Sequence, residues 1–162
     1  MKTFLDRQGK ICVPSATSIV RAREGAFSCC IHESRLLLIW PSYAPDVPEL
    51  PGGGIDAGEN PLQANKREFW EETGFTLNIA DRAIEGVFEQ TVDFYADDVD
   101  QYWIYKQSFY LIRDGLAAVF FDGTRPTPEK GLMRWVELKD LAVLPLHVMH
   151  KNALVNFGLS SD

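Results

Sequence analysis

Three carboxylates that fall within one turn of a predicted helix are the residues of this chain best suited to chemistry. Glu68, Glu71 and Glu72 would lie within about 100° of one another around the helix axis. Like-charge pairs at this spacing destabilise an isolated helix by about 0.2–0.5 kcal/mol each, and the negative end of the helix dipole adds to that penalty. A bound divalent cation such as Mg²⁺ or Mn²⁺ would offset the repulsion, because carboxylate oxygens are the ligands that such ions prefer.

The residues around this cluster decide between a metal site and an ordinary solvated helix face. Acidic faces are common on protein surfaces, and three glutamates alone favour that simpler interpretation. Here Glu59 comes just before the helix, Arg67 adjoins the cluster, and glycines stand at both ends, at 52–54 and at Gly74. This combination favours the metal site.

The segment from Gly53 to Phe75 resembles the Nudix box. That pattern is glycine, five residues, glutamate, seven residues, Arg-Glu, an apolar residue, any residue, Glu-Glu, any residue, glycine and an apolar residue, and every invariant position is matched. The departures are Phe69 and Phe75, where aliphatic residues are commoner, and they should change packing but not charge. The resemblance implies an α/β fold, a Nudix-like α/β/α sandwich with a mixed sheet between helices. It also implies a metal-dependent hydrolase of diphosphate linkages.

Roles for individual residues follow from the same resemblance. It implies metal binding by Glu68, Glu71 and Glu72, with contributions from Glu59 and from the backbone carbonyls of Gly52 or Gly53. Arg67 would orient a glutamate of the box through a salt bridge to Glu68 or Glu71. Glu59 would either brace the loop or supply a further carboxylate. We expect the catalytic set to be Arg67, Glu68, Glu71, Glu72 and Glu129.

Glu129 is the candidate general base from outside the box. Metal ions would neutralise the diphosphate oxygens and lower the pKa of a bound water, and a carboxylate would accept the water's proton. The water would attack one phosphorus in line with the departing phosphoryl group. Glu129 stands in a turn before a predicted strand, where a solvated role is an equal alternative. Its rivals for the role are Glu89, Asp93, Asp97 and Asp98.

Histidines and aromatic residues give weaker signals. His32, His147 and His150 are too scattered for a metal site, and helix packing explains the last two more simply. Aromatic side chains usually fill a core, but some could stack on a nucleobase. Four such candidates are Tyr43, Phe88, Trp103 and Tyr105.

The elements that must position these residues can be predicted from patterning and caps. Asn60, Pro61, Gln63 and Gly74 predict a helix over residues 61–73, with a capping box at its start and glycine after its end. Residues 1–25 are predicted to be an N-terminal arm or an edge hairpin with a turn at 7–9. Strands are predicted over residues 26–32, 35–40, 84–94, 101–112 and 133–137, and a last helix from Pro145.

Composition limits the class of protein. A chain of 162 residues suits one domain over residues 1–162. Its formal net charge of -7 disfavours binding to duplex nucleic acid. The cysteines, Cys12, Cys29 and Cys30, do not have the spacing of a disulfide framework, and adjacent Cys29 and Cys30 should point to opposite faces of a strand. With neither a long apolar run nor a signal sequence, we expect a cytoplasmic protein that binds no membrane.

The preferred function is cleavage of the diphosphate linkage in a small nucleoside diphosphate derivative or a nucleoside triphosphate. The alternatives are removal of diphosphate from an RNA 5′ end, which the acidic balance disfavours, and a non-catalytic module that senses a nucleotide. Such modules typically lose box acids, whereas all are present here. An ADP-ribose substrate loses support because the next proline after Phe75 is Pro126. The sequence leaves a homodimer open.

Overall fold

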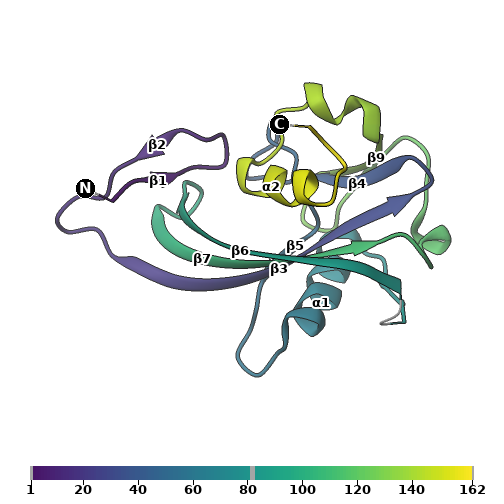
Figure 1. Cartoon of the computed structure of the whole chain (residues 1–162), viewed down its shortest axis with the longest axis horizontal. Coiled ribbons are helices and arrows are strands. Elements are labelled where there is room, and N and C mark those ends of the chain that lie inside the picture. Colours follow the sequence, from purple (N-terminus) through teal and green to yellow (C-terminus); the bar gives the residue numbers. More distant parts are fainter. Residues whose placement is uncertain (1, 81–82, 162) are drawn as a thin grey trace.

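A computed structural model describes residues 2–80 and 83–161 of the chain. Within these residues it contains two α-helices and nine strands (Figure 1). The helices are α1 (Pro61–Thr73) and α2 (Val148–Asn156). The strands are β1 (Phe4–Leu5), β2 (Ile11–Cys12), β3 (Val20–His32), β4 (Arg35–Trp40), β5 (Gly52–Gly54), β6 (Ile84–Ala96), β7 (Gln101–Ile112), β8 (Thr124–Pro126) and β9 (Leu132–Glu137). None of these helices is long and apolar enough to cross a membrane.

β3 joins two parts of the sheet. Residues 20–30 of β3 pair in parallel with β7, whereas its last residues pair antiparallel with β4. The main order is β2-β1-β6-β7-β3-β4-β9-β8, and β5 pairs antiparallel with residues 25–27 of β3. The glycines of β5 thereby lie beside the centre of the sheet, immediately before the segment that leads into α1.

Alternating side chains of β3 supply two hydrophobic cores, one on each face of the sheet. Cys29 packs with Met149 and Leu154 of α2, whereas Cys30 packs with Ala64 and Phe69 of α1. Figure 1 shows the two helices on opposite sides of the sheet. The predicted α/β/α layering is therefore confirmed, as are the opposite directions of the two cysteine side chains. Burial raises the pKa of both thiols, and all three cysteines are unpaired within the described residues.

The helix that carries the acidic cluster begins and ends where its caps predict. The Asn60 side chain accepts from the Gln63 N–H, and the Gln63 side chain accepts from the Asn60 N–H, both at 2.9 Å. Gly74 adopts the left-handed conformation after the last turn, with φ of 75°. These contacts fix the register of the helix and so decide which side chains face β5.

The starts of β3 and α2 differ most from the prediction, because local sequence patterns do not determine them. β3 begins at Val20, six residues before the predicted start at Ala26, because pairing with β7 organises residues that remain exposed. The prediction that Pro145 opens the last helix was wrong. α2 begins at Val148, since the His147 ring caps it by accepting from the Met149 N–H at 3.3 Å.

The N-terminal residues form a hairpin at the edge of the sheet. β1 pairs antiparallel with β2 and in parallel with β6, where Leu5 lies opposite Phe94. The turn that joins β1 and β2 lies at residues 6–9, with Gly9 at φ of 86°. This turn presents Arg7 toward the loop between β6 and β7, and so brings the hairpin to the edge of the functional site.

Candidate active site

Arg67 is the centre of the acidic turn of α1. Its Nε and Nη2 donate to the two carboxylate oxygens of Glu59 at 2.8 and 2.9 Å, a bidentate geometry of the strong type. Its Nη1 donates to Glu68 at 2.7 Å and to Glu71 at 3.1 Å. Nη2 also donates to the Gly54 carbonyl at 2.9 Å. One cation thus ties the end of β5, the loop before α1 and the acidic face of α1 together.

Glu59 is held as a brace for that loop. Hydrogen bonding from Arg67, with a further bond from the Asp56 N–H, lowers the pKa of the Glu59 carboxyl to about 2. Both of its oxygens are engaged in these bonds. Of the two roles that the sequence left open for Glu59, this geometry favours bracing the loop.

Glu72 lies behind this network and is buried. One of its oxygens accepts from the Gly52 N–H at 2.7 Å. Burial raises the pKa of the Glu72 carboxyl well above its usual range, and the nearby charges of Glu49, Glu68 and Glu129 raise it further. Burial likewise raises the pKa of Glu68. The charged forms of these carboxyls are therefore disfavoured beside one another, and a further cation on this side of α1 would favour them.

The backbone of β5 approaches these carboxylates at positions where only glycine fits. A Cβ atom at Gly53 would come within 2.5 Å of a carboxylate oxygen of Glu68. A Cβ at Gly52 would overlap the Ala26 carbonyl oxygen, and Gly52 has φ of 149°. The two glycines thus let the backbone lie directly against the acidic side chains.

The donor set fits a hard divalent cation by its chemistry. It consists of carboxylate oxygens on α1 and the backbone of β5, at a place where negative charge is in excess. As the side chains stand, no three acidic, histidine or cysteine residues in the described ranges converge on one point as metal ligands do. Arg67 hydrogen-bonds to two of the carboxylates, those of Glu68 and Glu71, and Glu72 accepts from the Gly52 N–H.

Glu129 is brought to the same cluster from the turn before β9. Its carbonyl accepts from the Ser42 hydroxyl at 3.0 Å, and it lines a small recess together with Tyr43 and Glu72. Its charge raises the pKa of both Glu68 and Glu72. A turn residue that is distant in sequence is therefore within electrostatic reach of the predicted metal ligands.

The rival carboxylates are mostly engaged elsewhere. Asp93 pairs with Lys2 at 2.9 Å, Asp97 pairs with Arg7 at 2.6 Å, and Glu89 accepts from the Ser108 hydroxyl at 3.2 Å. Asp98 also pairs with Arg7, at 2.7 Å, but it lines the main cavity. Glu129 is therefore a stronger candidate than these four rivals, because its charge raises the pKa of two box acids, Glu68 and Glu72.

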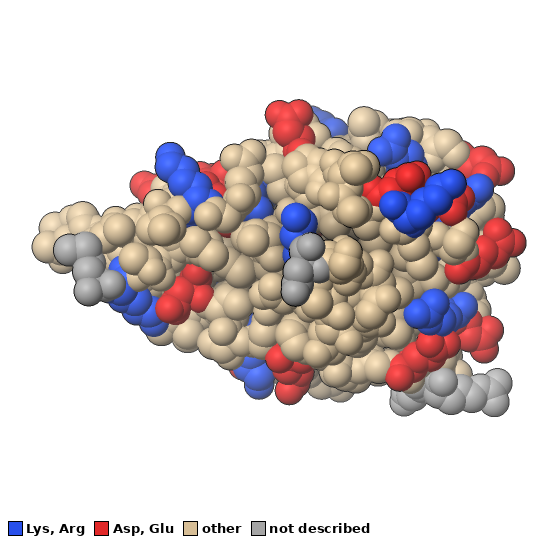
Figure 2. Space-filling model, turned by 45° about the horizontal axis from the view of Figure 1, so that its top comes forward, with Lys and Arg blue, Asp and Glu red and all other residues tan. Residues whose placement is uncertain are grey.

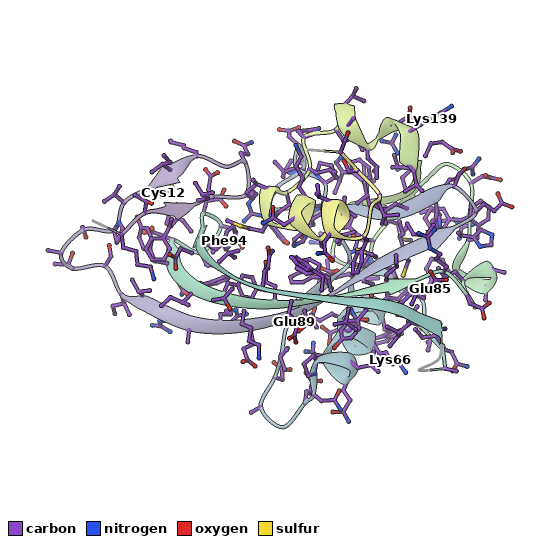
Figure 3. All side chains as sticks on the ribbon, in the orientation of Figure 1. Cys12, Lys66, Glu85, Glu89, Phe94 and Lys139 are labelled. Atoms are coloured by element: carbon purple, nitrogen blue, oxygen red, sulfur yellow. The ribbon has the colours of Figure 1, made fainter. Side chains whose placement is uncertain are left out.

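A cavity of about 280 Å³ extends from the acidic cluster to Phe94. That size is close to the lower end of small-molecule sites, about 300–1,000 Å³. Figure 3 shows Phe94 on the side of the sheet that faces α2. Glu89, labelled in the same view, lies on the other side of the sheet. The cavity is lined by Gly52, Gly53, Gly54, Glu68 and Glu72 from β5 and α1, by Arg23, Phe27, Phe94, Trp103, Tyr105 and Gln107 from β3, β6 and β7, and by Arg7, Tyr43, Glu49, Asp98, His147 and His150 from surrounding segments.

Glu49 is a functional candidate that the sequence patterns missed. It is buried in the cavity wall and accepts from the Tyr43 hydroxyl at 2.5 Å. Burial raises the pKa of its carboxyl to about 7, although the Tyr43 hydrogen bond and the charge of Arg7 oppose this. Its position directly before the glycine-rich segment was the only available signal. Arg7 was also missed, because the residues that pair with it lie about ninety positions away.

Three of the four aromatic residues considered for stacking on a nucleobase line the cavity, and one lies in the core. Trp103, Tyr105 and Tyr43 line the cavity, whereas Phe88 packs on Phe109 in the core, with ring centroids 6.0 Å apart. The guanidinium of Arg23 lies 4.8 Å from the Trp103 ring centroid. The cavity therefore offers flat apolar walls at a distance from the acidic cluster.

His147 and His150 serve the packing of α2, as predicted. Their rings stack with centroids 4.4 Å apart, and the His150 Nδ1 accepts from the Leu50 N–H at 3.1 Å. Burial lowers the pKa of His147 to about 3 and that of His150 well below its usual range. Both rings are therefore neutral, which suits their position between the sheet and α2.

The surface charge agrees with the composition. On the face shown in Figure 2, acidic and basic side chains of the described residues are interspersed, without a broad basic area. A protein that binds a long phosphate backbone usually presents a broad basic surface. The negative charge of the whole chain, -7, points in the same direction.

Comparison with known proteins agrees with the fold and the box. The chain is 31% identical over 98 residues to the RNA pyrophosphohydrolase of Roseobacter denitrificans, covering 57% of this chain and 61% of that one. It is 41% identical over 69 residues to a Bacillus subtilis protein provisionally named 8-oxo-dGTP diphosphatase, covering 41% and 44%. The chain thus spans less than two thirds of either relative.

The fold is that of known Nudix structures. The crystal structure of the MutT protein from Bacillus halodurans superposes with a TM-score of 0.57 at 20% identity, over 86% of this chain and 84% of that one. Residues 22–157 match the NUDIX domain, a range that includes the box, the sheet and α2. The chain belongs to the Nudix family.

Proposed function

We propose that this protein hydrolyses the diphosphate linkage of a small nucleoside diphosphate derivative or nucleoside triphosphate, with Mg²⁺ or Mn²⁺ as cofactor. The observation that carries the proposal is the buried carboxyl of Glu72, which lies among Glu49, Glu68 and Glu129 and forms no salt bridge within residues 2–80 and 83–161. A divalent ion would supply the missing positive charge. The names of the two relatives describe hydrolysis of nucleotide diphosphate linkages in those proteins.

The acidic cluster would bind the metal through Glu68, Glu71 and Glu72, with the backbone of Gly52 or Gly53. When bound, the metal would neutralise the diphosphate oxygens and lower the pKa of a water molecule. To bind the ion, Glu68 and Glu71 would each give up the hydrogen bond that Arg67 donates to its carboxylate. Arg67 would remain anchored through its bidentate contact with Glu59.

Residues of the chain would accept the proton of the attacking water and position the metal-binding carboxylates. Glu129 has a side chain in the recess beside Glu72 and would accept the proton of the attacking water. Arg67 would position Glu68 and Glu71, because it hydrogen-bonds to both carboxylates. The cavity beyond β5 would hold the part of the substrate that does not react.

Removal of diphosphate from an RNA 5′ end is a second candidate. One of the relatives is named for that activity. The interspersed surface charge and the net charge of -7 favour a small nucleotide over a long RNA. Direct competition between nucleoside triphosphates and a short 5′-triphosphate RNA would distinguish the two.

The proposal is tested by measuring phosphate and diphosphate release from a panel of nucleotides with Mg²⁺, with Mn²⁺ and with a chelator. We expect turnover only with metal. Glu72→Gln should lose at least about a hundredfold in rate while remaining folded, because it removes a group that stabilises the transition-state charge through the metal. Glu85→Gln is the matched control, since Glu85 pairs with Arg113 away from the cavity (Figure 3). Equal rates for Glu72→Gln and the parent would refute the metal assignment.

A further inference from the structure

The side-chain amide of Gln107 is held in one orientation at the floor of the cavity. Gln90 Nε2 donates both to the Met149 carbonyl and to Gln107 Oε1, each at 2.8 Å. A backbone carbonyl only accepts, so the Gln90 atom in the middle must be the nitrogen, and the Gln107 atom facing it must be the oxygen. Asn152 Nδ2 donates to the Gln90 oxygen at 2.9 Å, which completes the chain.

This orientation leaves the Nε2 of Gln107 facing the cavity. Gln107 is 1% exposed, and none of the hydrogen bonds found among the described residues uses its Nε2. This nitrogen is not among the fully enclosed donors without a partner in the described residues, where Asn65 Nδ2 stands alone, so the Nε2 of Gln107 opens onto the cavity that Gln107 lines. A donor in so enclosed a position is normally satisfied by a ligand or by water. Tyr105, two residues earlier on β7, lines the same cavity, and its hydroxyl lies against Gly25, which has no side chain.

The surroundings of Gln107 fit a flat ligand with polar edges. Phe27, Trp103 and Tyr105 give the cavity aromatic walls, and the carboxyl of Glu49 lines it as well. Gln107 lies opposite Gly25 in the β3–β7 ladder, and Gly25 lies opposite Gly54 in the β3–β5 ladder. The amide is therefore only two strands away from the glycines of the box. A nucleotide with its diphosphate beside β5 could place its base over the floor of the cavity.

We propose that Gln107 is a specificity-determining residue, whose amide donates to a carbonyl oxygen or ring nitrogen of the substrate's nucleobase. This inference rests on the proposed function, because it assumes a nucleotide in the same cavity. Gln107 takes no part in the hydrolytic step. A base that offers no acceptor at this point would leave the amide unpaired, and sites built around a hydrogen bond discriminate strongly against such ligands.

Two substitutions separate the hydrogen bond from the packing. Gln107→Glu keeps an oxygen for Gln90 but replaces the donor with an acceptor, whereas Gln107→Met removes both polar atoms and keeps the length of the side chain. Ser108→Ala is the matched control, because Ser108 is the next residue of β7 and its hydroxyl contacts Glu89 on the other side of the sheet. Thermal unfolding establishes that each variant is folded. If Gln107→Glu fails to fold, Gln107→Met carries the test.

The readouts are kcat/KM for ATP, GTP, CTP and UTP, and the dissociation constants of their non-hydrolysable α,β-methylene analogues. We expect both Gln107 variants to lose about tenfold or more for the parent's preferred base and clearly less for the others, so that the order of preference changes. Ser108→Ala should keep the parent's order. An equal loss for all four bases, or no loss, would overturn the proposal.

The two kinds of readout also separate this inference from the proposed function. If no nucleotide is hydrolysed but the analogues bind with a preference that Gln107→Met abolishes, the hydrolytic proposal fails and the role of Gln107 stands. If nucleotides are hydrolysed but the Gln107 variants leave the base preference unchanged, the hydrolytic proposal stands and the role of Gln107 is refuted.

Discussion

Replacing Glu49 by glutamine should make the protein more stable at neutral and alkaline pH. Glu49 is 7% exposed, and burial raises the pKa of its carboxyl from 4.5 to about 7. Between these two values the folded protein keeps the proton that the unfolded chain releases. The stabilisation from neutral Glu49 is therefore complete below pH 4.5 and is lost as the pH rises through about 7.

The size of the effect follows from the pKa change. Each pKa unit corresponds to about 1.4 kcal/mol, so the parent should lose about 3 kcal/mol of stability from this one group by pH 8. Glu49→Gln has no proton to lose and can still accept from the Tyr43 hydroxyl, which now lies 2.5 Å from the Glu49 carboxyl. The variant should match the parent near pH 4.5 and exceed it by up to about 3 kcal/mol above pH 7.

The measurement is urea unfolding of both proteins from pH 4.5 to pH 8, followed by tryptophan fluorescence. The difference between the two curves isolates Glu49 from other groups whose pKa is raised, such as Glu72. Glu137→Gln is a control without pH dependence in this range, because hydrogen bonding from Arg35 lowers the pKa of the Glu137 carboxyl from its usual value of 4.5. Its stabilising effect is present throughout pH 4.5–8 and is lost only at lower pH, so the Glu137→Gln profile should run parallel to that of the parent. Superimposable pH profiles for Glu49→Gln and the parent would refute the buried-carboxyl argument.

Three further substitutions test the backbone around the site. Gly53→Ala should fold but lower kcat at least about tenfold, because its Cβ displaces the Glu68 carboxylate; an unchanged kcat would contradict this. Gly52→Ala should lose at least about 2 kcal/mol in urea unfolding, since its Cβ would overlap the Ala26 carbonyl at a left-handed φ. Asn60→Ala should lose about 1 kcal/mol by removing the cap of α1, whereas retained stability would show that the cap is dispensable.

The parts of the site that sequence analysis predicted are those that local rules determine. The start and end of α1 follow from Asn60, Gln63 and Gly74, because capping depends on residues within a few positions of each other. Once the helix is fixed, the spacing of Glu68, Glu71 and Glu72 fixes their common side. A contiguous segment therefore contained the information needed to predict where these acids lie.

The boundaries that could not be predicted depend on partners distant in sequence. Residues 20–24 of β3 are exposed and show no apolar pattern, and only the ladder with β7 makes them a strand. The start of α2 depends on the His147 ring, a capping group that standard preferences do not anticipate. The pattern of apolar residues in a sequence identifies the buried faces of strands and helices. It therefore does not predict an element boundary that hydrogen bonds alone determine.

Two cavity residues, Gln107 and Glu49, could not be identified from the sequence for the same reason. Before the fold is known, Gln107 is one of several polar residues in a strand, and nothing distinguishes it from its neighbours. Its importance arises because Gln90 and the Met149 carbonyl, from β6 and α2, fix its amide so that the nitrogen faces the cavity. Glu49 likewise gains its raised pKa only when Tyr43 and Arg7 close around it. The proposed metal site is therefore encoded locally, whereas the proposed contact with the nucleobase requires segments that only the folded sheet brings together.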